Sequence, residues 1–485
     1  MHTLRHRLAA TAVSLVTMTG ALTGLAVSAQ AGTKSMHPDG GGVPTTKTDP
    51  SKFKTCEEPP GDTLWETAKG SDVGLDDAAL QKAADFYRDN LQATMRVYRF
   101  NCLVKTGTFD PIEERRPAHM FSTTKPTMTL LAGRAIDLGL LSVDDTVGRF
   151  FPGQGDAAHR AITVKQLLQH TSGIYKNWSQ ELNESIPDAV KFFFDLKIVH
   201  PPGTFYEYSQ AGCNMMSALI EKAVGMPLQT FAQKELFDKI GIVDGTWFWQ
   251  RDRAGWSYGY SGLYLRPIDM VRIGTLLRQG GVYRGQRVVS EQFVKDMATG
   301  SAQNPGFGYN TWVNAAPWYV TVAINQRQVE QRPIIASAPH DMYFSWGWRG
   351  RHIFVLPDLG MVVTVTPFAV QAPVPGFAST FMNGYPGQGP GSGPGGQMDG
   401  HQISHAELNK GYHDFFRILM SSVKDQKVSD PGEWDQPNDN NFDQSLFIGD
   451  PSGTVNENDF GKTNAANDED SAKAPGVWAK ALTTK

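Results

Sequence analysis

Apolar residues recur at helical spacing along several stretches of this 485-residue chain. Spacings of three and four residues predict amphipathic helices with one buried face. Two of the predicted helices carry end signals, because Thr163 is a suitable N-cap and Gly225 stops a helix. The helices predicted in this way span residues 75–92, 128–140, 163–168, 211–224, 267–278 and 405–423.

Strand-like patterns occur near both ends of this series of helices. Residues 95–104 read as a strand, and residues 352–356 and 361–366 flank Pro357-Asp358-Leu359-Gly360, which predicts a hairpin. A helix and a strand therefore come first, a helical stretch follows, and strands and a last helix end the pattern. This order predicts an α+β fold, with an antiparallel sheet flanked by helices and a mostly helical subdomain.

Shifts in composition divide the chain into parts. Residues rich in Gly, Thr, Lys and Pro precede the first helix, and the last sixty residues contain few apolar side chains. The predicted parts are a linker and N-terminal extension (32–70), an α/β subdomain that carries the sheet (71–130 and 265–425), a helical subdomain (131–264), a flexible Gly- and Pro-rich loop (383–400) and a poorly ordered tail (426–485).

The first residues have the pattern of a secretory signal. Arg5-His6-Arg7 is basic, Leu8–Val27 is apolar, and Ala29-Gln30-Ala31 fits a cleavage site, so residues 1–31 are predicted to be removed on export. An uncleaved anchor is the alternative, and the interspersed Thr, Gly and Ser weaken it. We therefore expect a secreted or cell-envelope protein without stable membrane insertion after cleavage.

The net charge and the cysteines narrow the picture further. The formal net charge is −4, which suggests no polyanionic partner, so no nucleic acid is expected. Export makes disulfides possible, and Cys56–Cys102 is the favoured pair among the three cysteines. Cys213, early in an apolar helix, is interpreted as a buried core thiol.

The strongest chemical feature is Ser122-Thr123-Thr124-Lys125, just before the helix predicted at 128–140. A serine and a lysine three apart on one helix point the same way, and an amine kept neutral can take the hydroxyl proton. The same spacing occurs at Ser51/Lys54 and Ser421/Lys424, so the string alone is weak.

Four patterns in order strengthen this assignment. Ser122-Thr123-Thr124-Lys125 is followed by His170-Thr171-Ser172-Gly173, then Tyr208-Ser209-Gln210, then Trp346-Gly347-Trp348-Arg349. With this order, residues 75–425 resemble the serine β-lactamase and penicillin-binding-protein superfamily. The chain looks most like the branch that holds class C β-lactamases, β-lactamase-fold carboxylesterases and 6-aminohexanoate-dimer hydrolases.

The resemblance implies a role for each matching position. Ser122 would be the nucleophile, Lys125 its proton acceptor or electrostatic support, and Tyr208 the relay of the proton to the leaving group. The backbone N–H groups of Ser122 and of a strand residue near Trp348 would form the oxyanion hole. The resemblance also implies a β-lactamase/transpeptidase-like fold, with no cofactor and no metal.

Three features depart from the usual pattern of that superfamily, one of which is Pro126 in place of the serine often seen after the lysine. Gln210 stands where an asparagine is usual, and Trp346-Gly347-Trp348 replaces Lys-Thr-Gly or His-x-Gly. Gln210 is a candidate substrate or lysine contact. The candidate pocket and substrate-binding residues are Trp178, Trp346, Gly347, Trp348 and Arg349.

Competing sites are weaker. Gly255-Trp256-Ser257-Tyr258-Gly259 matches a nucleophile elbow, but the strand and helix that such a motif needs on either side are not predicted. His170 is interpreted as structural, and His401/His405 lacks the glutamate of a metal-hydrolase motif.

The sequence therefore predicts an exported serine hydrolase that cleaves a small amide or ester through an acyl-enzyme on Ser122. An acyltransferase or a true β-lactamase on the same fold is the first alternative. A catalytically silent penicillin-binding or sensor protein is an alternative of another class.

Overall fold

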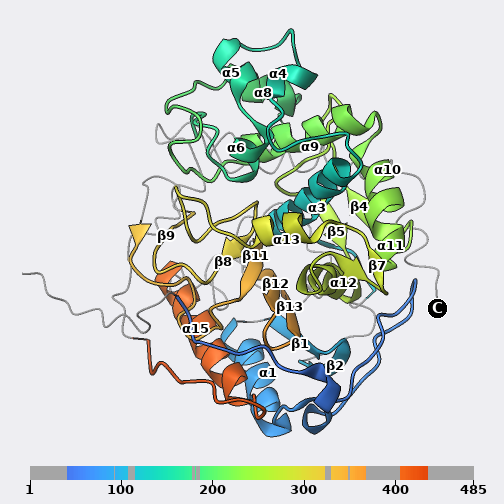
Figure 1. Cartoon of the computed structure of the whole chain (residues 1–485), viewed down its shortest axis with the longest axis vertical. Coiled ribbons are helices and arrows are strands. Elements are labelled where there is room, and N and C mark those ends of the chain that lie inside the picture. Colours follow the sequence, from blue (N-terminus) through green and yellow to red (C-terminus); the bar gives the residue numbers. More distant parts are fainter. Residues whose placement is uncertain are drawn as a thin grey trace, which may run out of the picture. The chain divides into compact units, whose positions relative to one another are not determined.

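The computed structural model is organised around one antiparallel sheet of six strands in the order β2-β1-β13-β12-β11-β8 (Figure 1). It describes residues 41–91, 93–107, 115–176, 181, 186–322, 329–347, 350–367 and 405–434. The strands of this sheet are β1 (Ala93–Arg99), β2 (Cys102–Thr106), β8 (Trp312–Val313), β11 (Tyr343–Gly347), β12 (Arg351–Leu356) and β13 (Met361–Pro367).

Both faces of the sheet are covered, and the side chains alternate between two hydrophobic clusters. On β12, Phe354 belongs to the cluster that also contains residues of α1 and α15, whereas Ile353 belongs to the cluster with α12. On the second face, helix α12 approaches closely at Gly274, where an added Cβ would lie 2.6 Å from Val362 Cγ1. The long helix predicted at residues 267–278 is thus a packing element of the sheet.

Helices and short strands make up the rest of the described chain. The helices are α1 (Asp77–Leu91), α3 (Thr124–Asp137), α4 (Val147–Phe150), α5 (Ala157–Ala161), α6 (Val164–Leu168), α8 (Ala189–Asp195), α9 (Gln210–Val224), α10 (Leu228–Ala232), α11 (Asp238–Ile240), α12 (Pro267–Arg278), α13 (Glu291–Met297) and α15 (His405–Ser421). The short 3-10 helices are η1 (Pro50–Lys52), η2 (Gly70–Val73) and η3 (Phe121–Thr123), and η4 (Gln233–Phe237) is a short π-helix. The short strands are β3 (Ala118–His119), β4 (Phe248–Trp249), β5 (Leu263–Leu265), β6 (Val282–Tyr283), β7 (Gln286–Arg287), β9 (Tyr319–Val320) and β10 (Val329–Glu330).

The predicted end signals act as expected. Thr163 caps α6, since its side chain accepts the Gln166 N–H while the Gln166 side chain accepts the Thr163 N–H. Gly225 ends α9 in a left-handed conformation. The predicted hairpin is also confirmed, because β12 and β13 pair from Leu356 and Met361 outward.

The prediction of one strand over residues 95–104 is wrong. The structure has two antiparallel strands, β1 and β2, separated by Phe100 and Asn101 with φ of 48° and 67°. Positive φ at both positions gives the twist of a tight hairpin. Phenylalanine is a poor local signal for such a turn. Contacts outside the hairpin hold it instead, since the Phe100 ring stacks on Phe53 and lies 4.8 Å from the Arg99 guanidinium.

The start of the described chain packs on the body of the protein, although the sequence predicts a linker there. Val43 is 3% exposed, and its N–H donates to Ala338 O at 2.9 Å. Thr46 N–H donates to Gln426 Oε1 at 2.9 Å. Val43 and Thr46 therefore contact two regions of the chain, around Ala338 and Gln426, that are remote in sequence.

Two further predictions from the sequence concern a disulfide and membrane-spanning helices. The disulfide Cys56–Cys102 is confirmed. No helix within the described ranges has the length and apolar character needed to cross a bilayer. The predicted signal at 1–31, the loop at 383–400 and the tail beyond Trp434 lie outside the described residues, and the division into subdomains stays a prediction.

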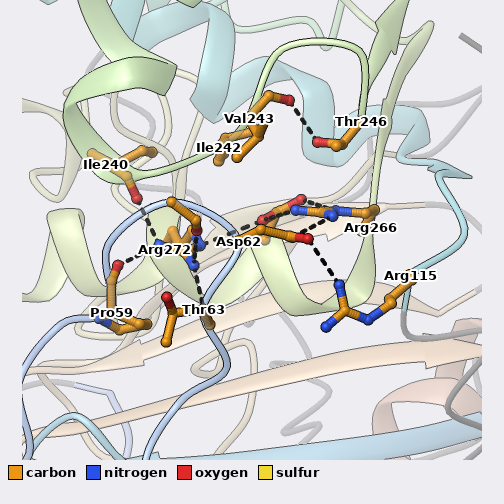
Figure 2. A network of polar contacts seen from close by, with 12 residues as sticks. Pro59, Asp62, Thr63, Arg115, Ile240, Ile242, Val243, Thr246, Arg266 and Arg272 are labelled. Carbon is orange, nitrogen blue, oxygen red and sulfur yellow. Dashed lines mark hydrogen bonds and ion pairs between the residues drawn. The ribbon is translucent and has the colours of Figure 1, made fainter. Parts of the chain in front are cut away.

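A buried guanidinium ties the N-terminal segment to helix α12 (Figure 2). Arg272 donates to Pro59 O at 2.7 Å, Ile240 O at 3.0 Å, Gly61 O at 2.6 Å and Thr63 O at 3.0 Å. The bonds to Pro59 O and Ile240 O are buried, and these two carbonyls would otherwise need another donor, because a buried acceptor without a partner is costly. Arg272 thus satisfies the backbone of a segment that has no regular secondary structure.

A chain of ion pairs extends from this network toward β3 (Figure 2). Asp62 accepts from Arg266 at 2.6 Å and from Arg115 at 2.9 Å, and Arg266 also pairs with Asp269 on α12. Arg115 lies just before β3, which leads directly to Ser122. The network therefore helps to fix the chain where it enters the candidate site.

We expect Arg272→Met to lower the free energy of unfolding by about 3–5 kcal/mol. The substitution removes the charged donor from the buried carbonyls of Pro59 and Ile240 and from Asp269. Urea or thermal unfolding followed by circular dichroism measures this change. Arg88→Met is the matched control, because Arg88 pairs with Asp85 and Asp89 at the surface. Equal stability of the two variants would contradict a structural role for Arg272.

Candidate active site

Ser122 and Lys125 meet where a tight turn becomes a helix. Ser122 lies in η3, which continues directly into α3, and Lys125 is in the first turn of α3. Lys125 Nζ lies 3.1 Å from Ser122 Oγ. The pair predicted from spacing alone is therefore within hydrogen-bond distance.

The backbone just before the serine is in an uncommon conformation. Phe121 has φ of 47°, in the left-handed region that bulky residues rarely adopt. Its ring makes an edge contact with His119 at 4.1 Å, and the Arg351 guanidinium lies 5.0 Å from its centre. Met120 N–H donates to Leu263 O at 2.7 Å and continues the pairing of β3 with β5. These contacts fix the orientation of Ser122, and backbone strain of this kind is frequent at functional sites.

Strand β11 lies against the serine turn. Thr123 Oγ1 donates to Arg351 O at 2.8 Å and lies 3.1 Å from Ser345 Oγ, which accepts the Ile353 N–H at 3.0 Å. An added Cβ at Gly347 would lie 2.8 Å from Met120 O and 2.8 Å from Thr123 Oγ1. Only glycine allows the end of β11 to approach the turn this closely.

Lys125 is buried, and its nearest contacts are uncharged groups. It is 1% exposed, its Nζ also donates to Tyr260 O at 3.2 Å, and the rings of Tyr208 and Tyr260 lie 4.6 and 5.6 Å away. Burial lowers the pKa of Lys125 from its ordinary 10.5 to about 8, while Cys213 and Glu181 act in the opposite direction. The amine is therefore substantially neutral at mildly alkaline pH.

Tyr208 contacts the same serine. Its hydroxyl forms a hydrogen bond with the Ser122 side chain, but burial raises the pKa of Tyr208 well above its ordinary range, so it is a neutral phenol. Its ring lies 4.8 Å from His170 and stacks on Trp312 at 6.1 Å. Ser122, Lys125 and Tyr208 thus form one cluster of side chains.

His170 lies beside this cluster and binds the backbone that follows Tyr208. Its Nδ1 accepts the Ser209 N–H at 2.9 Å, so its Nε2 carries the proton and donates to Asn310 Oδ1 at 2.7 Å. Burial, and then the charge of Lys125, lower the pKa of His170 to about 3. The thiol of Cys213 lies 3.4 Å from Nε2, and burial raises its pKa to about 12. Both groups are neutral near pH 7, as expected for structural residues.

Gln210 begins helix α9 and is buried. Its N–H donates to Glu181 Oε2 at 2.5 Å, and its side-chain Oε1 has no hydrogen-bond partner among the described residues. Lys125 bonds to Ser122 and Tyr260, and no hydrogen bond joins it to Gln210 in the described part of the chain. The predicted contact of Gln210 with substrate stays a prediction.

The predicted aromatic pocket can be located only in part. Trp346 is half-buried, with its ring 6.0 Å from Trp312, which stacks on Tyr208. An aromatic series therefore leads from the cluster to the end of β11. Trp178, Trp348 and Arg349 lie outside the described residues.

The competing serines lie elsewhere. Ser257 is 1% exposed, and its Oγ donates to Glu221 Oε1 at 2.7 Å. It has no helix directly after it, since the next one, α12, starts at Pro267. Ser51 lies in η1, and Ser421 is the last residue of α15. Of the Ser-x-x-Lys pairs, Ser122 and Lys125 lie in the cluster with Tyr208.

One group of metal-ligand side chains occurs among the described residues. His340, Asp341 and Asp358 offer ligand atoms within 4.8 Å of one another. Asp341 Oδ2 also accepts the Asp358 N–H at 2.7 Å. The sequence predicts no metal site, and that prediction stays untested.

Several residues of the site could not be found in the sequence. Thr123 and Tyr260 contribute a hydroxyl and a backbone carbonyl, and Glu181 contributes a carboxylate from a separate segment. No motif marks Tyr260 or Glu181. Thr123 lies inside the motif, but its bond to β12 depends on tertiary packing.

Residues 94–369, more than half of the chain, match the family model described as Beta-lactamase. The protein therefore belongs to the Beta-lactamase family and has the β-lactamase/transpeptidase-like fold, within the serine β-lactamase and penicillin-binding-protein superfamily. This confirms the resemblance found in the motifs. Proteins that resemble part of the chain include an esterase and acyltransferases.

Individual relatives are distant. ML-236A carboxylate methylbutanoyltransferase mlcH of Penicillium citrinum is 29% identical over 162 residues, 28% of this chain and 38% of that protein. Lovastatin esterase of Penicillium rubens is 28% identical over 157 residues, 27% of this chain and 39% of that protein. Each match thus spans less than half of the relative's length. The solved D-alanine carboxypeptidase AmpC from Burkholderia cenocepacia has a TM-score of 0.43 at 15% identity, covering 59% of this chain and 92% of that one.

We expect Gly347→Ala to slow labelling of Ser122 by a fluorophosphonate at least about tenfold, because the new Cβ must push β11 away from the serine turn. Intact-mass spectrometry over time measures the rate. Gly153→Ala is the matched control, since its Cβ would meet nothing within 4 Å. Labelling of the Gly347→Ala variant at the wild-type rate would show that the close approach is dispensable.

Proposed function

We propose that the protein is an exported serine hydrolase that cleaves a small amide or ester through an acyl-enzyme on Ser122. The observation that carries this proposal is the contact of Ser122 Oγ with both a buried amine, Lys125, and a buried phenol, Tyr208. Membership of the Beta-lactamase family supports it.

The neutral form of Lys125 has the hydrogen-bonding capacity that acylation requires. A neutral amine has two N–H groups and one lone pair; one N–H donates to Tyr260 O, and with Nζ 3.1 Å from Ser122 Oγ the lone pair of the neutral form can take the Ser122 proton. With a pKa of about 8, roughly a tenth of the amines are neutral at pH 7. Lys125 is therefore the better candidate for the general base, because burial disfavours the phenolate of Tyr208.

The proposed reaction forms an acyl-enzyme on Ser122 and then hydrolyses it. Ser122 Oγ attacks the substrate carbonyl carbon and gives its proton to Lys125 Nζ. The tetrahedral intermediate collapses, the bond to the leaving alcohol or amine breaks, and that group takes a proton from the Tyr208 hydroxyl, which regains one from Lys125. Water then attacks the acyl-enzyme and releases a carboxylic acid, with Ser122 restored.

The proposed oxyanion hole combines the N–H of Ser122 with an N–H just after Gly347, at Trp348. The close approach of β11 to the serine turn supports this arrangement. Export is supported by the Cys56–Cys102 disulfide together with the signal-like first residues.

Acyl transfer is the second candidate function. The methylbutanoyltransferase relative supports it, because an alcohol can replace water as the acceptor for the same acyl-enzyme. Adding a primary alcohol during ester turnover distinguishes the two: a transferase forms the new ester in preference to the acid.

We expect Ser122→Ala to reduce turnover of p-nitrophenyl esters by at least about 10³-fold, because no acyl-enzyme can form. Ser257→Ala, at the competing serine, is expected to stay near wild type. A fluorophosphonate adduct on Ser122 without turnover of esters, amides or nitrocefin would support the silent penicillin-binding alternative. Full activity in Ser122→Ala would reject the mechanism.

A pH profile tests the role of Lys125. The folded-state pKa of Lys125 is lowered to about 8, so the neutral base accumulates as the pH rises. We therefore expect kcat/KM to rise tenfold per pH unit below about 8 and to level off above it. Lys125→Arg, which stays protonated, should remove this rise and nearly all activity. A flat wild-type profile between pH 6 and 9 would exclude Lys125 as the base.

A further inference from the structure

Glu181 is a buried carboxylate beside the proposed active site. It is 1% exposed, and its Oε2 accepts the N–H of Gln210 at 2.5 Å and that of Ala211 at 3.3 Å, with Ser209 Oγ at 3.4 Å. These are the first groups of helix α9, whose unpaired N–H groups and dipole favour a negative charge. Glu181 thus fixes the start of α9 from a segment outside the helix.

Fixing this helix start also fixes Tyr208. Tyr208 immediately precedes Ser209, whose N–H is held by His170 Nδ1 while its hydroxyl lies against Glu181. The backbone after Tyr208 is therefore held by His170 on one side and Glu181 on the other. Release of either partner would let Tyr208 move away from Ser122.

Glu181 also supplies charge to the site. Lys125 forms no ion pair within 4.0 Å in the described chain, yet Glu181 is one of the two groups that favour its protonated form. The other groups facing Lys125 are Ser122, Tyr208, Tyr260, His170 and Cys213. None of these five carries a negative charge at neutral pH.

We propose that Glu181 is a positioning residue for acylation: its carboxylate holds the start of α9, and with it Tyr208, against Ser122, and it adds a negative charge to the surroundings of Lys125. The inference rests on the proposed function of Ser122. It assigns a role to a carboxylate that makes no contact with the reacting atoms. Lys176 is a second amine near this carboxylate: burial lowers the pKa of Lys176 to about 8, while the charges of Glu207 and then Glu181 act in the opposite direction.

The test separates the charge of Glu181 from its hydrogen bonds. Glu181→Gln keeps an oxygen that can accept the Gln210 N–H but removes the charge. Because that charge favours protonated Lys125, its loss should move the acid limb of kcat/KM to lower pH, by roughly half a unit or more. Glu181→Asp keeps the charge but is one methylene shorter, so it should leave the limb in place and reduce kcat about tenfold or more.

Glu221→Gln is the matched control. Glu221 is a half-buried carboxylate at the other end of α9 whose Oε1 accepts the Leu228 N–H at 3.1 Å, at the start of α10. It is not among the charges that act on Lys125, so this variant should leave the limb unchanged. Lys176→Gln identifies the titrating amine, because the limb should persist without Lys176.

Several outcomes would overturn the inference. One is a pH profile of kcat/KM for Glu181→Gln that superimposes on the wild-type profile. The others are an equal shift of the acid limb in Glu221→Gln and the loss of that limb in Lys176→Gln. If Glu181→Gln does not fold, the Asp variant decides, since unchanged kcat and pH profile would reject positioning. Absence of a Ser122 adduct in wild-type protein would instead reject the proposed function itself.

Discussion

The buried amine of Lys125 is the constraint on which the rest of the site depends. Moving an ammonium out of water is costly, and the protein limits that cost by letting the pKa fall to about 8. The surrounding groups then match a neutral amine, because Tyr260 O accepts one N–H and Ser122 Oγ lies at 3.1 Å. A more exposed lysine would keep its proton and would be a poor base for a serine hydroxyl.

Buried Lys125 can act on Ser122 only if the serine is held beside it, and strands of two different sheets contribute to this. The pairing of β3 with β5 positions the chain that enters η3, and the end of β11 lies against η3 at Gly347. Thr123 joins η3 to β12 through Arg351 O. The strained φ of Phe121 is therefore stabilised by contacts from outside the turn. A local shift of β11 would consequently change the position of Ser122.

Local sequence signals predicted the elements whose ends are set by the chain itself. Thr163 and Gly225 mark helix ends, and the turn at Pro357–Gly360 marks a hairpin, as the structure confirms. The turn at Phe100 and Asn101 was not predictable, because distant contacts with Phe53 hold it. The same limit applies to the site. Ser122, Lys125 and Tyr208 stand in motifs, whereas Glu181 and Tyr260 reach the cluster only through the fold.

The two candidate bases can be compared by the charges that each requires. A Tyr208 phenolate stabilised by protonated Lys125 would place an anion and a cation together in a buried site. Burial instead raises the pKa of Tyr208 and lowers that of Lys125, so both resting groups tend toward their neutral forms. The neutral pair avoids two desolvation costs at once. On the proposed mechanism, the reactive form of the site contains neutral Lys125, and its ammonium appears as Ser122 attacks, together with the developing oxyanion. The site is then best matched to the charge distribution of the transition state, which is the condition for catalysis rather than mere binding.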